Sequence, residues 1–311
     1  MKPPKRHHYL PQFYLNGFAH DQHFFVYDRE DNEYRKQTPK NTAVEKDFYT
    51  LTDDSGQKNT SIETIIAKIE SRAKPVIDKL DSAETITFEE RVVLSHFIAL
   101  FIGRTPEYDA TFKSLQDQLM RKANKVQFHS IERTQAVLDN YKATNPDKDT
   151  MSAEELFEFV QKDEYNIEFG RANTIDAMLE IAESLTKYFC QMNWVVYHSP
   201  RQTSFVTTDS PFIIFPPADR PKDTFFRGVG ILTPGANKII PLTQTTTLIM
   251  LDRGQSTVHK DLGRRFVRAI NLNLASQCFR FVIGRDETLL KDLVSKTKID
   301  QTKWKSGLIV G

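Results

Sequence analysis

The chain has 311 residues, 39% of them hydrophobic and 27% charged, and its 42 Lys and Arg against 41 Asp and Glu leave a formal net charge of +1. This length accommodates one large domain or two modest ones, and the composition excludes a chain that is disordered throughout. Near neutrality excludes a uniformly basic nucleic-acid binder, although it leaves room for a local basic groove.

The cysteine content and the start of the chain indicate in which cellular compartment we expect the protein. Cys190 and Cys278 are too few for a disulfide framework, and the Lys- and His-rich start lacks the apolar segment of a signal peptide. No apolar run approaches the roughly 18 residues that a membrane span needs. We therefore expect a cytoplasmic protein without a membrane segment. Both cysteines lie in apolar stretches, which favours packing over a nucleophilic role.

Short aromatic runs at residues 24–27 and 48–51, the first followed by turn-like residues, predict strands or a hairpin. Helical periodicity then extends from about residue 61 to 192. Within this block Pro75 should kink or break the first helix, and Thr87 begins a capping box ahead of a buried, almost wholly apolar helix. A second capping box begins at Ser152, and the charged stretch 139–151 predicts an exposed loop.

Beyond residue 192 the pattern changes to short β-branched or aromatic runs between turn residues. These runs predict strands over residues 194–197, 204–208, 212–215, 229–232, 238–241 and 246–251. A helix at about 262–275, a strand at 278–283 and a charged helix at 286–295 follow.

Runs of strands and of helices, rather than strict alternation, predict an α+β fold. The N-terminal strands are too few to stand alone, so we expect them to join the C-terminal strands in a mixed or antiparallel sheet, with a large helical block inserted between. The whole chain, residues 1–311, would form a single domain. It would have a helical subdomain at about 61–192 and a sheet subdomain at about 1–60 plus 193–311.

Several common catalytic motifs are absent from the sequence. There is no GxxxxGK[ST] phosphate loop, no GxGxxG, no HExxH, no CxxC pair and no GxSxG elbow. Nucleotide-driven motors, Rossmann dehydrogenases, zincins, zinc ribbons and ordinary serine hydrolases are therefore disfavoured.

The opening segment, HHYLPQFYLNGF, combines adjacent histidines with aromatics and embedded amides. Its aromatics could anchor it in the core and place His7 or His8 at a pocket rim, where an imidazole can act as acid, base or metal ligand. Equally, both histidines could form ordinary hydrogen bonds at an exposed, basic start. The residues alone leave these two interpretations open.

A strand that runs into Asp209 would hold a carboxylate at a strand end, where it could bind a divalent metal or take part in acid–base chemistry. The alternative is a turn, in which Asp209 bonds to its own backbone before Ser210 and Pro211. Arg104, at the end of the apolar helix, could bind a phosphate, or could pair with a structural acid. His96, inside that helix, is better read as a core histidine.

Arg264, Arg265 and Arg268 lie within about one turn of a predicted helix, a spacing that suits contacts to phosphates. A solvated helix face is the ordinary alternative. Positive charge is concentrated here and at residues 2–6, whereas acids populate the helical block. The near-zero net charge is therefore the sum of unlike regions.

Taken in order, several segments resemble domain-of-unknown-function family 4238, a group of mainly bacterial proteins. The matching segments are HHYLPQFYLNGF, FFVYDRE, IETIIAKIES, FIALFIGRTP, SFVTTDSPFII, KIIPLT and RAINLNLASQCFRFVIG. The resemblance supplies no catalytic assignment. It implies that some polar residues recur together and gather at one site, namely His7, His8, Gln12, Arg104, Asp209 and Asn271. The spacing does not distinguish Asn271 from Asn273.

These residues lead us to expect a hydrolase, foremost a nuclease or other phosphodiesterase acting on RNA or DNA, in a defence or toxin-like role. His7 or His8 would serve as acid or base, Asp209 would hold a metal or orient the histidine, and Arg104 would stabilise phosphate charge. The substrate would be bound by Gln12, Arg264, Arg265, Arg268 and Asn271.

The rival hypotheses are a binding module that senses an anionic ligand or a protein, and a purely structural role for the same residues. The placement of the side chains separates these hypotheses. A site is favoured if the histidines, Arg104 and Asp209 line one pocket within about 10 Å, and the structural reading is favoured if each has its own local partner.

Overall fold

The computed structural model describes residues 6–46, 51–52, 58–59, 61–167, 169–217 and 229–297. The fold is α+β, as the sequence predicts. The chain divides into two compact units, one within Met1–Tyr108 and Ile175–Lys305, and the other within Asp109–Thr174. Each unit is described by itself.

Strands from both ends of the chain form a four-stranded sheet in the first unit. β2 (Phe24–Asp28) and β3 (Glu33–Gln37) form an antiparallel hairpin. β13 (Phe281–Gly284) pairs antiparallel with β2 on one edge and with β8 (Thr207–Thr208) on the other. The predicted joining of N-terminal and C-terminal strands is therefore confirmed. The run predicted at 48–51 lies mostly outside the described residues.

A five-stranded mixed sheet has the order β12-β7-β11-β10-β9. Its strands are β7 (Met192–His198), β9 (Ile213–Phe215), β10 (Asn237–Pro241), β11 (Thr246–Arg253) and β12 (Thr257–Asp261). All of its pairs are antiparallel except β12 with β7. The sequence did not predict β12, a mostly exposed edge strand with one apolar residue. The strand predicted at 229–232 is wrong, because Gly230 interrupts the apolar run and the chain turns there.

The remaining strands of this unit are short. β1 (Arg6–His8) pairs antiparallel with β4 (Val44–Lys46), and β5 (Leu51–Thr52) pairs with β6 (Lys58–Asn59). Between β1 and β2 lies the helix α1 (Gln12–Asn16), and a 3-10 turn (Pro39–Asn41) precedes β4.

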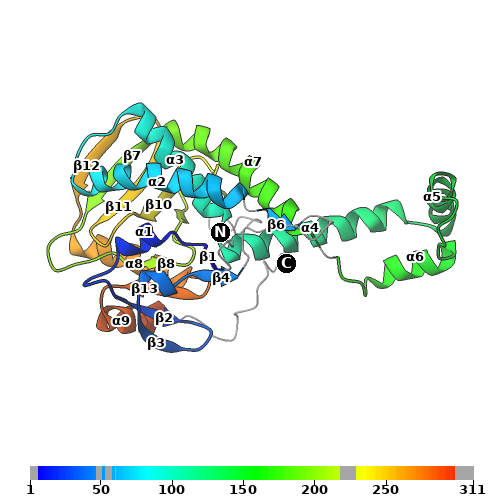
Figure 1. Cartoon of the computed structure of the whole chain (residues 1–311), viewed down its shortest axis with the longest axis horizontal. Coiled ribbons are helices and arrows are strands. Elements are labelled where there is room, and N and C mark those ends of the chain that lie inside the picture. The colour runs from blue at the N-terminus through cyan, green and yellow to red at the C-terminus, as the bar shows by residue number, and fades with distance from the viewer. Residues whose placement is uncertain are drawn as a thin grey trace. The chain divides into compact units, whose positions relative to one another are not determined.

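Helices pack against the five-stranded sheet in a large apolar core (Figure 1). They are α2 (Ser61–Asp81), α3 (Phe88–Gly103) and α7 (Arg171–Cys190). A second core forms around α8 (Arg264–Ser276) and α9 (Glu287–Thr297). On β10, Ile240 belongs to the first core and its neighbour Ile239 to the second. Because successive residues of a strand face opposite ways, the sheet is covered on both faces.

Two helix predictions have different outcomes. The capping box at the start of α3 is confirmed, since the Thr87 hydroxyl accepts from the Glu90 N–H and the Glu90 carboxylate accepts from the Thr87 N–H. Of the kink or break predicted at Pro75, the break is wrong, because α2 runs on to Asp81. Burial of Val76, Ile77 and Leu80 beyond the proline holds this last part of α2 in the core, which offsets the lost helical hydrogen bond.

The second unit is helical. It contains most of α4 (Pro106–Gln127), together with α5 (Ile131–Thr144) and α6 (Ala153–Lys162), which pack against each other. The capping box of α6, Ser152 with Glu155, is confirmed. The predicted loop at 139–151 is shorter than expected, since α5 continues to Thr144. In neither unit does a described helix have the length and apolarity to cross a membrane.

The cap of α3 can be tested by substitution. Replacing Thr87 with Ala should lower the free energy of unfolding by about 1 kcal/mol, because the N–H of Glu90 loses its acceptor. Thr87→Ser keeps the hydroxyl and should stay close to the wild type. Urea denaturation measures both variants, and equal stability of Thr87→Ala and Thr87→Ser would contradict the assigned cap.

Candidate functional site

Asp209 follows β8 and is buried, with 1% of its surface exposed. Its carboxylate oxygens accept from the backbone N–H of Phe279 at 3.1 Å and of Arg280 at 2.6 Å, in the segment that leads into β13. Asp209 thus bonds to a distant part of the chain, not to its own turn. Burial raises the pKa of Asp209 to about 7 although these donors act to lower it.

Glu107, near the start of α4, is an acid whose charge acts on the carboxyl of Asp209. Its carboxylate accepts a hydrogen bond from the Ser210 hydroxyl. Burial raises the pKa of Glu107, and the charge of Glu107 in turn contributes to the raised pKa of Asp209. Burial and the charge of Asp209 also raise the pKa of Tyr9. We call Tyr9, Glu107, Asp209 and Ser210 the acidic centre.

A cluster of ion pairs adjoins the acidic centre through Arg280. The guanidinium of Arg280 binds the buried carboxylate of Asp28 in a bidentate manner, at 2.9 and 2.8 Å, and Arg35 pairs with the same carboxylate. Burial acts to raise the pKa of Asp28, but the hydrogen bonds and charge of Arg280 outweigh it and lower that pKa. This cluster joins the β2–β3 hairpin to the start of β13.

Arg104 and the two histidines meet through the backbone of β1. The Arg104 guanidinium, 3% exposed, donates to the carbonyl of His8 at 2.7 Å and pairs with Glu70 of α2 at 2.5 Å. The Nε2 atom of the buried His7 lies 3.5 Å from the carboxylate of Glu63.

The His8 Nε2 atom lies 3.1 Å from the carbonyl oxygen of Lys40. These neighbours differ from those of Asp209, so the structure gives the histidines and Asp209 separate local partners. Gln12, the first residue of α1, is exposed.

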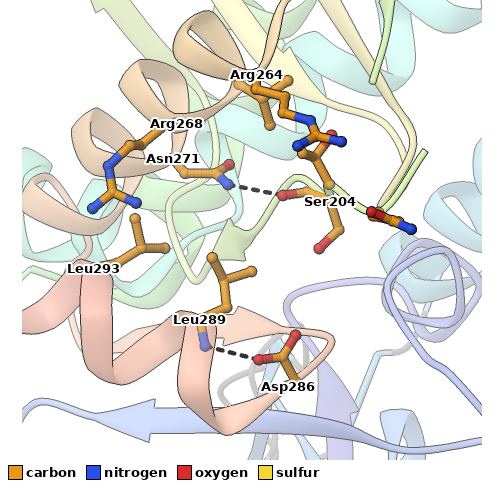
Figure 2. Close-up of a pocket in the computed structure, with 10 residues that line it drawn as sticks. Ser204, Arg264, Arg268, Asn271, Asp286, Leu289 and Leu293 are labelled. Atoms are coloured by element: carbon orange, nitrogen blue, oxygen red, sulfur yellow. Dashed lines mark hydrogen bonds between the residues drawn. The ribbon is translucent and has the colours of Figure 1, made fainter. Parts of the chain in front are cut away.

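The predicted substrate-binding residues of α8 are brought together in part. Arg264, Arg268 and Asn271 line a pocket of about 270 Å³, which we call the α8 pocket. Arg265 does not line it. Figure 2 shows Arg264 and Arg268 on the α8 side of the opening and Leu289 and Leu293 on the α9 side.

The structure distinguishes the two asparagines of α8. The buried Asn271 accepts from the N–H of Val206 and donates to the carbonyl of Ser204, which holds one wall of the pocket. Asn273 donates to a carbonyl of its own helix. Asn271 is therefore the one that shapes the pocket.

His96 and the cysteines have the surroundings of packing residues. His96 is half-buried, and burial, followed by the charge of Arg72, lowers its pKa. Cys190 and Cys278 are buried and free, and burial raises the pKa of the Cys278 thiol. Among the described residues, no group of three or more His, Cys, Asp or Glu side chains is arranged to hold a metal ion.

Sequence reasoning missed a polar cluster at the edge of the five-stranded sheet. His198 Nε2 and His259 Nδ1 lie 3.0 Å apart on the adjacent strands β7 and β12. The Nδ1 atom of His198 lies 3.3 Å from the Thr246 hydroxyl, which donates to Asp81 at the end of α2. Burial, then the neighbouring His259, lowers the pKa of His198. No local motif joins these residues, because strand pairing alone brings them together.

Comparison with known proteins supports the resemblance noted above. The model of a family described as protein of unknown function (DUF4238) matches residues 6–288. The chain belongs to this family. No curated protein and no solved structure matches it. The matched range includes the acidic centre, the cluster around His198 and the α8 side of the pocket, whereas Leu289 and Leu293 on the α9 side lie beyond it.

Titration of Asp209 should be visible in the stability of the protein. Because the pKa of Asp209 is raised in the folded state, its contribution is present below about pH 4 and is lost as the pH rises through about 7. The loss amounts to at most about 4 kcal/mol. The free energy of unfolding of the wild type, relative to Asp209→Asn, should therefore be higher at pH 5 than at pH 8.

Guanidinium denaturation at the two pH values measures this difference, and a difference that is the same at both would contradict the assignment. Glu107→Gln offers an internal check. It removes the neighbouring charge that helps to raise the pKa of Asp209, so the range of pH dependence should move downward.

Proposed function

We propose that the protein binds a phosphate-bearing ligand of about the size of a nucleotide in the α8 pocket. The observation that carries this proposal is the placement of Arg264 and Arg268 at one opening above an apolar floor of Val267, Leu289 and Leu293. Guanidinium groups suit the geometry of phosphate oxygens, and an apolar floor suits a base or another flat group.

The two arginines differ in their availability. Arg268 pairs with Asp292 of α9 at 2.6 Å, so a ligand must share or displace that partner. Arg264 is exposed and has no ion-pair partner among the described residues. Arg264 is therefore the primary phosphate contact. The pocket volume of about 270 Å³ lies near the lower end of the range for small-molecule sites, roughly 300 Å³ upward, which favours a single nucleotide over a larger ligand.

Isothermal titration with nucleoside monophosphates and with inorganic phosphate tests this function. Arg264→Ala should weaken binding of the monophosphates at least tenfold, because the charged contact to phosphate is lost. Arg265→Ala is the matched control, since Arg265 adjoins Arg264 on α8 but does not line the pocket, and it should leave the affinity unchanged.

Two outcomes would contradict the binding proposal. One is a wild-type protein that binds none of these probes. The other is an equal loss of affinity in the Arg264 and Arg265 variants, which would indicate attraction by the general charge of α8 rather than a pocket.

Hydrolysis of a phosphodiester in RNA or DNA is the second candidate, and the acidic centre favours it. A carboxyl group that titrates near neutral pH beside a second acid can give and take a proton during catalysis, and the pKa of Asp209 is raised to about 7 beside Glu107. In this proposal Asp209 and Glu107 give and take the proton during catalysis. Arg104 holds β1 in position by donating to the carbonyl of His8. A nuclease of this kind would act in the bacterial cytoplasm in a defence or toxin-like role.

A cleavage screen on RNA and DNA with added divalent metals tests the second candidate. Asp209→Asn and Glu107→Gln should each lower cleavage at least a hundredfold with the circular dichroism spectrum unchanged. His8→Ala tests the expected role of that imidazole in the same assay. Glu89→Gln, an exposed acid of α3, is the control, and full activity in the Asp209 and Glu107 variants would exclude this assignment.

A further inference from the structure

A second pocket lies in the first unit, between α1, the last turns of α2 and the turn that joins β10 to β11. It is lined by Phe13 and Asn16 from α1, by Asp78 and Asp81 from α2, and by Gln244 from the turn. Its volume is about 250 Å³. Sites for drug-sized ligands range upward from roughly 300 Å³, so this pocket suits a smaller molecule. We call it the Asp81 pocket.

Backbone contacts hold two walls of the Asp81 pocket together. The N–H of Gln244 donates to the carbonyl of Gly17, just after α1, at 2.8 Å. A Cβ atom at Gly17 would lie 3.1 Å from the carbonyl oxygen of Tyr14 and 3.4 Å from that of Leu242. The absence of a side chain at Gly17 therefore lets the β10–β11 turn approach α1 closely.

The carboxylate of Asp81 is hydrogen-bonded on one oxygen. Its Oδ1 atom accepts from the hydroxyls of Thr243, Thr245 and Thr246, the first two at 2.7 and 2.8 Å. Its Oδ2 atom accepts no hydrogen bond from the residues that the structure describes. The three hydroxyls fix the carboxylate in one orientation, and the second oxygen keeps its lone pairs for a ligand.

The negative charge of Asp81 has no cationic partner within the described part of the chain. Lys74, which also lines the pocket, pairs with Asp78, whereas Asp81 takes part in no ion pair there. His198 is linked to Asp81 through one threonine hydroxyl, but burial lowers the pKa of His198, so this imidazole is neutral at pH 7. A ligand that complements the pocket therefore carries a positive charge.

Two amides and an aromatic ring surround this charge. The side-chain amides of Asn16 and Gln244 make no hydrogen bond with the described residues. An amide both donates and accepts, which suits a hydroxyl group, since a hydroxyl does the same. Phe13 is half-buried, and its ring lies 5.4 Å from that of Phe97 in the core. The Phe13 ring thus offers the pocket a fixed apolar surface for the carbon skeleton of a ligand.

We propose that the Asp81 pocket binds a small organic amine that also carries hydroxyl groups, such as an amino sugar or an amino alcohol. Its ammonium group donates to Oδ2 of Asp81 in a charge-assisted hydrogen bond. Its hydroxyl groups form hydrogen bonds with the amides of Asn16 and Gln244. No residue lines both this pocket and the α8 pocket, so the two sites are separate.

Isothermal titration of the full chain at pH 7 with glucosamine, glucose and cyclohexylamine tests the proposal. Glucosamine should bind at least tenfold more tightly than glucose, which lacks the amine, and than cyclohexylamine, which lacks the hydroxyls. Asp81→Asn should weaken glucosamine binding at least tenfold. The circular dichroism spectrum should stay unchanged, because Asn keeps an oxygen for the threonine hydroxyls. Glu84→Gln is the matched control, since Glu84 is an exposed acid just beyond α2 that does not line the pocket, and it should change the affinity less than threefold.

A second variant tests the hydroxyl contacts without changing the charge. Gln244→Ala should weaken glucosamine binding at least threefold, because one partner of the hydroxyl groups is lost. The proposal is overturned if the wild type does not bind glucosamine or binds glucose equally well. It is also overturned if Asp81→Asn and Glu84→Gln weaken binding to the same extent, since general negative charge would then account for the attraction.

Discussion

Strand β13 is the element on which the first unit depends, because it is hydrogen-bonded along both edges. One edge pairs with β2 from the start of the chain and the other with β8, which follows the helical block. Without this strand the N-terminal hairpin would have no sheet to join, and a two-stranded hairpin is marginal in water. Because β13 pairs with both β2 and β8, the helical block can separate these two strands in the sequence while both belong to one sheet.

The two residues just before this strand, Phe279 and Arg280, bind the buried carboxyl groups that lie beside it. Arg280 binds the buried Asp28 on one side, and the backbone N–H groups of Phe279 and Arg280 bind the buried Asp209 on the other. The two carboxyl groups respond in opposite directions. Full guanidinium charges outweigh burial at Asp28, whereas backbone dipoles do not outweigh it at Asp209. The residues just before β13 therefore bind two carboxyl groups: that of Asp28, in a structural ion pair, and that of Asp209, which can exchange protons near neutral pH.

Much of the fold could be predicted because its signals are local. Capping boxes at Thr87 and Ser152 and the strand over residues 24–27 depend on neighbouring residues, and the structure has all of them. The predicted helix break failed at Pro75, where tertiary packing outweighs local preference, since the helix continues and the residues beyond the proline are buried. The edge strand β12 was missed because an exposed edge needs few apolar residues.

The sequence by itself determined the α+β class, the family and the candidate residues, since composition, periodicity and motifs are properties of neighbouring residues. Only the tertiary structure decided their partners. In the tertiary structure Arg104 pairs with Glu70 and donates to the His8 carbonyl, and the charge of Glu107 acts on the buried Asp209. His198 lies within hydrogen-bonding distance of His259. The physical reason is that burial and electrostatic coupling depend on distance in space, and strand pairing and core packing place residues far apart in the chain within that distance.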